Sequence, residues 1–478
     1  MQALIFIFLP IVSFLHWFVC RKKLWAQNGL IVLSSYAFYA WWEWRFLALL
    51  AGSSILSWGC GLAVGRWRES APRRALFFNA LNIVVNLIVL ALFKYYDFFA
   101  QSFADAFLGG NASGFLFHLA LPVGISFYTF KALAYTIEIR RGTISSERDP
   151  LPVLAYISFF PQLLAGPIER PQHLIPQFKQ LRTFSYAQAT DGCRQILWGL
   201  FKKVVIADNC ALYVNEVWDN VGSEAGSSLL LAAILFSVQI YGDFSGYSDI
   251  SIGVGKLLGV RSRKNFDMPY FSRGIAEFWR KWHISLTSWF RDYVYIPMGG
   301  SRCSKGHVIF NTLVVFLLSG LWHGADWTFV FWGAYNGLLF VPGLLSGHRP
   351  RYRDTVAQWR MLPSFKELGL MLFTFGLATI GWILFRADNL QQAVAFFAGM
   401  GHLGTLKAPL LFFVMPRIRM QMVFICCLLV AEWTGRKKQD FSGIRTRYKL
   451  LNWCLYLSIA ILVFWFWRND STFIYQQF

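Results

Sequence analysis

Long apolar runs separated by short basic clusters dominate the chain. The first run, 4–19, is followed at once by Arg21, Lys22 and Lys23. Further apolar runs occupy 28–44, 45–65, 76–93, 121–139, 309–322, 327–345, 367–385, 409–431 and 450–467. Most approach the ~20 residues that a helix needs to cross a bilayer. The pattern predicts an all-α polytopic membrane protein with about ten to twelve spans.

The basic clusters set the expected orientation. Four loops are rich in Lys and Arg, namely 66–74, 140–148, 349–366 and 435–449, whereas 97–118 contains neither. Because Lys and Arg are retained on the cytoplasmic side, we expect these four loops in the cytosol and both termini outside it. No basic residue precedes the run 4–19, so it does not resemble a cleavable signal.

Two regions depart from simple spans. Residues 151–206 are apolar but broken by Pro161, Gly166, Pro167, Pro171 and Pro176, which favours re-entrant or interfacial segments buried in protein. Residues 227–260 are predicted as two apolar segments around 242–247, and residues 262–308 as a basic, aromatic segment at the cytosolic interface. With no fixed-period repeat and no soluble stretch, the interpretation is one membrane domain over 1–478.

Composition agrees with this class and narrows the function. The chain is 56% hydrophobic and 15% charged, against about a quarter charged in soluble proteins. Its net charge of +20 lies in the loops, so the positive-inside rule explains it better than nucleic-acid binding. The eight cysteines show no C-x-x-C or zinc spacing, so we expect neither a disulfide framework nor a metal.

Two histidines are the first candidates for chemistry. His323 follows Trp322 at the turn between two apolar runs, and Ser319 and Gly320 leave room on its helical face. An ionisable group at membrane depth suggests function, and neutral imidazole suits a general base near pH 7. The alternative is a packing histidine bonded to a neighbouring helix, and the pattern does not decide between them.

His283 is expected nearer the cytosol. It is either an interfacial anchor or a group that acts with Arg280 and Lys281 on a phosphate-bearing donor. Asp243 and Glu169 are weaker candidates, which we expect to pair with arginines inside the bundle. Gly242 and Gly246 are expected to allow close helix packing.

The C-terminal tail, 468–478, is the remaining candidate. It ends in Phe473, Tyr475 and Phe478, spaced as F-x-Y-x-x-F. Composition alone favours an interfacial anchor.

Seven stretches in order resemble the membrane-bound O-acyltransferase (MBOAT) family, in particular its alginate O-acetyltransferase branch. They are LPVGISFYTF from Leu121, FFPQLLAGPIER from Phe159, QIYGDFSGYSD from Gln239, FWRKWHISL from Phe278, YIPMGG from Tyr295, GLWHG from Gly320 and FRAD from Phe385. The resemblance implies a helical bundle with re-entrant and interfacial helices around a central funnel or tunnel.

The same resemblance implies roles. His323 is similar to the family's catalytic histidine and His283 to its second histidine. Tyr475 would be an acyl carrier, with acetyl-CoA as donor and no metal. The expected partners are the bilayer of a bacterial inner membrane and a periplasmic SGNH/GDSL-type acetyltransferase. A polysaccharide, either an alginate-like exopolysaccharide or peptidoglycan, would be the indirect acceptor.

Other functions remain open at this point. A transporter or flippase would also have broken helices and buried polar groups, although it should show internal repeats. A structural subunit of a polysaccharide export complex is a third interpretation. Within acyl transfer, D-alanylation of teichoic acid is the alternative, and the tail favours acetyl transfer.

Overall fold

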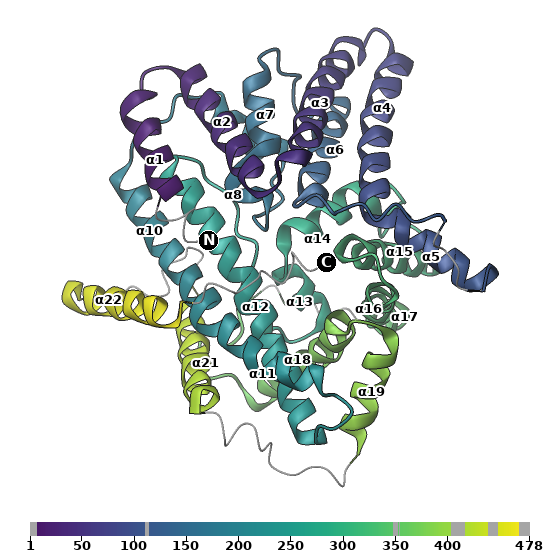
Figure 1. Cartoon of the computed structure of the whole chain (residues 1–478), viewed down its shortest axis with the longest axis vertical. Helices are drawn as coiled ribbons and strands as arrows, with labels where there is room; N and C mark the ends of the chain where they lie inside the picture. The colour runs from purple at the N-terminus through teal and green to yellow at the C-terminus, as the bar shows by residue number, and fades with distance from the viewer. Residues whose placement is uncertain are drawn as a thin grey trace. The chain divides into compact units, whose positions relative to one another are not determined.

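The structure is a computed structural model that describes residues 7–109, 114–347, 352, 354–402, 416–437 and 448–467. These residues form helices joined by turns and loops, with no strand among them (Figure 1). The chain divides into two compact units. The first is Met1–Cys193 with Ser251–Arg263, and the second is Arg194–Ile250 with Lys264–Phe478. The prediction of one membrane domain, 1–478, stays a prediction.

The helices of the first unit are short at its start and long in its middle. They are α1 (Leu9–Phe14), α2 (Leu24–Glu43), α3 (Leu47–Trp67), α4 (Pro72–Leu90), α5 (Tyr96–Phe107), α6 (Ile125–Arg141), α7 (Pro150–Ser158), α8 (Phe160–Leu163) and α9 (Pro171–Phe178). Helices α10 (Tyr186–Leu200) and α12 (Gly226–Leu257) cross the boundary between the units.

The second unit contains the longer C-terminal helices and several short ones. They are α11 (Asp208–Asp219), α13 (Ile275–Lys281), α14 (Ile284–Phe290), α15 (Lys305–His323), α16 (Trp327–Leu338), α17 (Val341–Ser346), α18 (Phe365–Arg386), α19 (Leu390–Gly401), α21 (Pro416–Gly435) and α22 (Lys449–Phe466). Residues 201–207, between α10 and α11, form a π-helical segment.

Seven helical stretches among the described residues are long and apolar enough to cross a membrane. They are Leu24–Trp67, Pro72–Phe107, Gly226–Leu257, Lys305–His323, Trp327–Ser346, Phe365–Arg386 and Lys449–Phe466. A polytopic helical membrane protein is thereby confirmed. The first stretch contains both α2 and α3. Helix α6 is not among the seven because it has only 17 residues. The figure of ten to twelve spans therefore stays a prediction.

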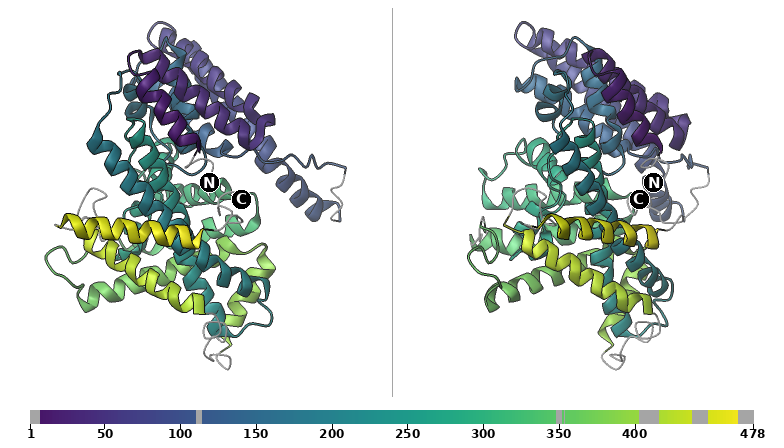
Figure 2. Two further views of the ribbon diagram at one scale, coloured as in Figure 1. Left: turned by 60° about the vertical axis from the view of Figure 1, so that its left-hand side comes forward. Right: turned by 90° about the vertical axis from the view of Figure 1, so that its left-hand side faces the viewer.

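Polar side chains join the helices of the first unit. Helices α3, α4 and α6 pack against one another (Figures 1 and 2). Between them Ser57 donates to Asn82 at 2.9 Å, and the Asn82 amide donates to Thr136 at 3.0 Å. Hydrogen bonds between small polar side chains are a usual link between membrane helices, where apolar surface alone gives little attraction.

Two sequence predictions were wrong. Residues 97–118, expected as a loop, contain most of the helix α5, which follows α4 through a π-helical turn. Residues 227–260, expected as two segments, contain the single 32-residue helix α12. The glycines of α12 do not interrupt the helix, because they lie where a neighbouring backbone segment approaches it closely. A Cβ on Gly246 would lie 2.7 Å from the carbonyl oxygen of Gly199.

Lysines, rather than arginines, pair with the buried carboxylate of α12. Lys203 lies 2.6 Å from Asp243 and 2.7 Å from Asp208, and Lys202 lies 2.5 Å from Asp249. The expected arginine partner of Asp243 is therefore wrong. A buried ion is tolerated when an opposite charge and hydrogen bonds replace its hydration. This cluster fastens the π-helical segment 201–207 to α12.

Glu169, in the first unit, also lacks the expected arginine side-chain pairing. Its carboxylate instead accepts a hydrogen bond from the backbone N–H of Arg263. The bond ties the loop after α8 to the segment that follows α12.

Glycines bring α15 and α16 into close contact. A Cβ on Gly320 would overlap the carbonyl oxygen of Phe329, and one on Gly333 would lie 2.5 Å from that of Phe316. Small residues allow helix backbones to approach in this way. Gly320, three positions before His323, therefore makes room for the backbone of α16 and not only for the imidazole.

Replacing Gly320 with Val should therefore separate the two helices. We expect the thermal midpoint of the detergent-purified protein to fall by several degrees, since overpacking costs about 1–3 kcal/mol. Gly306→Val is the matched control, because a Cβ on Gly306, in the same helix, meets nothing within 4 Å. Equal midpoints for the two variants would contradict the close packing.

Candidate active site

His323 is the last residue of α15, at the turn into α16. Gly324 follows in an extended conformation, and Asp326 caps α16 by accepting a hydrogen bond from the Thr328 N–H at 2.7 Å. An aspartate at this position stabilises a helix start. The turn is therefore fixed from both sides, and the histidine backbone is held with it.

Aromatic rings surround the imidazole of His323. Its ring centroid lies 5.0 Å from Trp322, 5.1 Å from Trp332 and 5.2 Å from Phe385, and the residue is 4% exposed. Trp382 and Trp279 pack behind Trp332, at 6.1 Å and 5.6 Å. A site of this kind excludes water, which strengthens electrostatic interactions inside it. The depth predicted for His323 is consistent with its burial.

The aromatic residues of this enclosure were not predicted from the sequence. Phe385 was quoted only as part of a stretch, and Trp332 and Trp382 were not singled out. The available signal was weak, because tryptophan is abundant throughout this chain, with 21 residues. Which of them converge on one histidine depends on the packing of α15, α16 and α18.

His283 is buried within the protein. It precedes α14 with a φ of +44°, and it is 1% exposed. The left-handed backbone is uncommon outside glycine. The imidazole Nδ1 lies 3.2 Å from Oδ1 of Asn265. Burial lowers the pKa of His283 to about 3, so the imidazole is neutral near pH 7.

One indole ring connects the two histidines. Trp322 lies 5.8 Å from the ring of His283 and 5.0 Å from that of His323. Phe244 of α12 packs edge-on against His283 at 4.6 Å. The structure therefore brings together two histidines that are 40 positions apart in the sequence.

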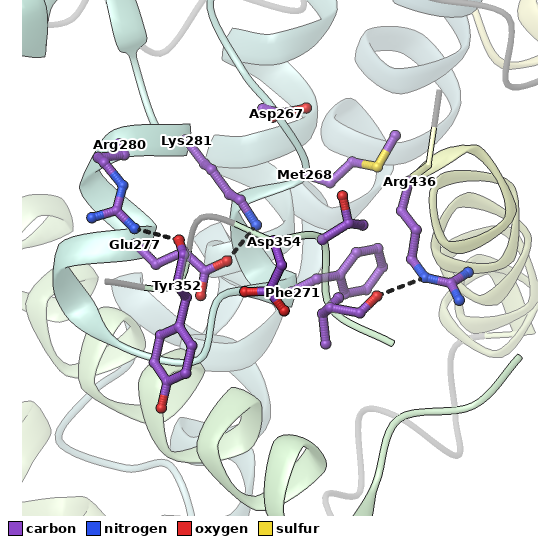
Figure 3. A pocket seen from close by; sticks show the side chains of 11 residues that line it. Asp267, Met268, Phe271, Glu277, Arg280, Lys281, Tyr352, Asp354 and Arg436 are labelled. Atoms are coloured by element: carbon purple, nitrogen blue, oxygen red, sulfur yellow. Dashed lines mark hydrogen bonds and ion pairs between the residues drawn. The ribbon is translucent and has the colours of Figure 1, made fainter. Parts of the chain in front are cut away.

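Arg280 and Lys281 lie in the last turn of α13 and line a cavity of about 310 Å³ (Figure 3). Neither histidine lines it. The two predicted donor-binding residues are therefore together, at a cavity separate from the aromatic enclosure. Tyr352, Asp354 and Arg436 from later parts of the second unit complete its wall.

The carboxylates of this cavity already have cationic partners. Asp267 pairs with Lys264 at 3.0 Å, and Glu277 with Lys281 at 2.8 Å. Asp354 pairs with Arg273 at 3.1 Å, which holds the pKa of that carboxyl below its usual range. The negative charges are therefore compensated before any ligand is considered.

Two arginines of the cavity wall, Arg280 and Arg436, form no ion pair with a carboxylate of the described residues. Arg280 donates to the carbonyl of Tyr352 at 2.8 Å, and Arg436 donates to the carbonyl of Val356 at 3.1 Å (Figure 3). Arg436 also donates to the carbonyls of Ala357 at 3.1 Å, Arg360 at 2.8 Å and Trp433 at 2.5 Å. Carbonyls are neutral, and each guanidinium has five N–H donors. The cavity therefore suits an anionic group, and Arg436 is a candidate that sequence reasoning missed.

Other predicted site features are placed as follows. Tyr475, with the rest of the tail 468–478, lies outside the described residues. Within the described ranges no three His, Cys, Asp or Glu side chains are placed to hold a metal ion. The described site thus offers two buried imidazoles, an apolar enclosure and a separate cavity with basic side chains in its wall, which is a set suited to proton transfer at a hydroxyl.

Known proteins match this chain along most of its length. The model of the membrane-bound O-acyltransferase family, MBOAT, matches residues 141–385. The chain is 38% identical to the probable alginate O-acetylase AlgI of Pseudomonas aeruginosa over 84% of its own length and 75% of that protein's. It is 35% identical to the peptidoglycan O-acetyltransferase of Helicobacter pylori over 83% and 78%.

The teichoic acid D-alanyltransferase of Bacillus subtilis is a more limited match. It is 30% identical over 46% of this chain and 58% of its own length. The matched family region contains Arg280, Lys281, His283 and His323, as well as Trp332 and Phe385. Transport and a purely structural role, the two alternatives from other classes, are not supported. The chain belongs to the membrane-bound O-acyltransferase family and is a multi-pass membrane acyltransferase.

Proposed function

We propose that the protein is an O-acetyltransferase that passes an acetyl group from cytosolic acetyl-CoA across a bacterial inner membrane. The acetyl group goes through Tyr475 to a periplasmic SGNH/GDSL-type acetyltransferase that modifies a polysaccharide. The observation that carries the proposal is the buried His323 in its enclosure of Trp322, Trp332 and Phe385. That enclosure lies within the region matched by the family model.

His323 acts as the general base. It takes the proton of the attacking hydroxyl, and the oxygen forms a bond to the thioester carbonyl carbon. The C–S bond then breaks, and the CoA thiolate leaves and takes up the proton. The products are an acetyl ester and coenzyme A. A neutral hydroxyl is a weak nucleophile, so removal of its proton by a neutral imidazole in a dry site is the main help that it needs.

The position of His323 supports access from both membrane faces. Helix α15 rises about 27 Å from Lys305 to His323, at 1.5 Å a residue. Lys305 lies near the end of the basic segment 262–308 that we place at the cytosolic interface, so the histidine would lie past the middle of a core of ~30 Å. A thioester arm entering from the cytosol and a hydroxyl entering from outside can then meet there.

Two observations bear on the acyl group and the acceptor. The acetyltransferase relatives match more than four fifths of the chain, whereas the D-alanyltransferase matches less than half. This supports acetyl as the acyl group. Both an alginate-like exopolysaccharide and peptidoglycan remain acceptors in the proposal, because relatives named for each match the chain at similar identity.

Replacing His323 with Ala should lower acetyl transfer by about 10²–10⁴-fold, the usual contribution of a general base. The measurement is acetyl-CoA consumption and acetylated product in proteoliposomes with the partner present. His307→Ala is the matched control, because His307 lies in the first turn of the same helix, where it contacts the Met298 carbonyl at 3.1 Å and the ring of Phe310, away from the aromatic enclosure. Wild-type transfer by the His323 variant would refute the proposal.

Replacing Tyr475 with Phe should keep an aromatic ring in the tail and remove only the hydroxyl. We expect the acetyl mass on the C-terminal peptide to disappear in peptide mass spectrometry after incubation with acetyl-CoA. Tyr448→Phe, outside the tail, should keep that mass. If the Tyr475 variant supports normal transfer to the partner, the tyrosine carrier is wrong and the tail is an anchor.

Replacing Arg280 or Arg436 with Gln should raise the KM for acetyl-CoA about tenfold with kcat nearly unchanged, since a charge-assisted hydrogen bond contributes about 1.5–3 kcal/mol. With S-acetylpantetheine, which lacks the nucleotide phosphates, the variants should match wild type. Arg291→Gln is the control, because Arg291 is exposed and pairs with Asp292 outside the cavity. Unchanged KM values for acetyl-CoA would remove this cavity from donor binding.

A further inference from the structure

Asn265 makes a buried set of hydrogen bonds around His283. Its side chain is 1% exposed. The amide nitrogen donates to the Ser248 hydroxyl at 3.1 Å, and the amide oxygen lies 3.2 Å from both the Ser285 N–H and the His283 Nδ1. The Asn265 carbonyl also accepts from the N–H of Ile284 at 2.8 Å. Asn265 therefore contacts the start of α14 through both its backbone and its side chain.

The orientation of the amide follows from its partners. The backbone N–H of Ser285 can only donate, so the atom facing it must be the amide oxygen. The opposite end of the amide is then the NH₂ group, which faces the Ser248 hydroxyl. A flipped amide would place its own N–H against the Ser285 N–H. The oxygen assignment thus rests on a donor whose role is fixed.

The same oxygen determines which ring nitrogen of His283 carries the proton. The Ser285 hydroxyl lies 2.9 Å from the Asn265 oxygen but 3.5 Å from the His283 Nδ1, so its proton goes to the amide. If Nδ1 were unprotonated, its lone pair would point at a lone pair of the amide oxygen, and the two would repel each other. The Nδ1 therefore carries the hydrogen and donates it, which leaves the lone pair on Nε2.

Nε2 of His283 is buried and makes no hydrogen bond to any described residue. Buried polar atoms are nearly always satisfied, so one without a partner calls for an explanation. The rings in contact with this imidazole are those of Phe244, Phe266 and Trp322. These rings make the surroundings apolar, and the pairing that the nitrogen lacks would then come from a substrate.

We propose that Asn265 is a positioning residue that holds His283 in its Nδ1–H tautomer, so that Nε2 accepts a hydrogen bond or proton from an O–H or N–H group of a substrate during acyl transfer. This deepens the proposed function and rests on it. It also excludes one role for His283, because a nitrogen with a lone pair cannot donate to a developing oxyanion. Stabilisation of that oxyanion must come from another group.

Nitrogen-15 NMR of the full chain, labelled at histidine and reconstituted in lipid, reads the tautomer directly. The chain has eight histidines, and the spectrum of His283→Gln identifies the missing ring. We expect a protonated Nδ1 and a bare Nε2 in wild type. A protonated Nε2 in wild type, whether neutral or imidazolium, would overturn the proposal without any need for a folded Asn265 variant.

Kinetics then test whether the tautomer matters. Asn265→Ala should lower kcat by about 10–100-fold, the usual effect of removing a group that orients a histidine, with the KM for acetyl-CoA nearly unchanged. Ser285→Ala is the matched control, because it removes another donor to the same oxygen and leaves the Nδ1 contact. It should keep both the tautomer and kcat.

The outcomes separate this proposal from the broader one. If the Asn265 variant changes the tautomer but keeps the wild-type kcat, the positioning role is wrong and acetyl transfer stands. If His323→Ala still transfers acetyl groups at the wild-type rate, the proposed function fails whatever the tautomer of His283. A loss of kcat in Ser285→Ala equal to that in Asn265→Ala would make the effect one of local packing, against the proposal.

Discussion

The close contact of α15 with α16 is the constraint on which the candidate site depends. Gly320 and Gly333 leave no room for a side chain where the helices cross. Because the backbones touch there, His323 at the end of α15 lies against Trp332 on α16. Helix α18 adds Phe385 to the same enclosure. The dry surroundings of this histidine are obtained here from aromatic side chains that the packing of α15, α16 and α18 brings together.

The two parts of the site solve different physical problems. The cavity at Arg280 and Arg436 has cationic side chains in its wall. Its carboxylates Asp267 and Asp354 pair with Lys264 and Arg273. The enclosure buries the imidazoles of His323 and His283 among aromatic rings. A phosphate-bearing donor with a long uncharged arm is divided in the same way as the site. Its anionic groups are at one end, to match the cavity, and its thioester is at the other, to match the enclosure.

Much of this was predictable from the sequence, and the reasons for the failures are specific. Apolar runs and basic loops indicated the helical membrane class, because hydropathy follows directly from the bilayer. The motif around His323 indicated the histidine itself. The stretch 242–247 was taken to divide two apolar segments, whereas α12 runs through it without a break. The close packing expected of Gly246 is confirmed by the approach of Gly199 from α10. The sequence left His283 open between an interfacial anchor and a group acting on the donor. Its burial was not predictable, because it depends on a left-handed backbone and on packing against Phe244 and Trp322. Asn265 and Arg436 carried no local signal, because their importance arises from contacts between distant segments.

The most direct test of the account uses sealed proteoliposomes in which the protein has one orientation. Acetyl-CoA is supplied only at the face with the basic loops, and a protease added to the opposite face releases the C-terminal peptide for mass spectrometry. The account predicts an acetylated peptide from the opposite face with wild-type protein and none with His323→Ala. Donor consumption that leaves the peptide unmodified in wild type, or equal acetylation in both proteins, would contradict it.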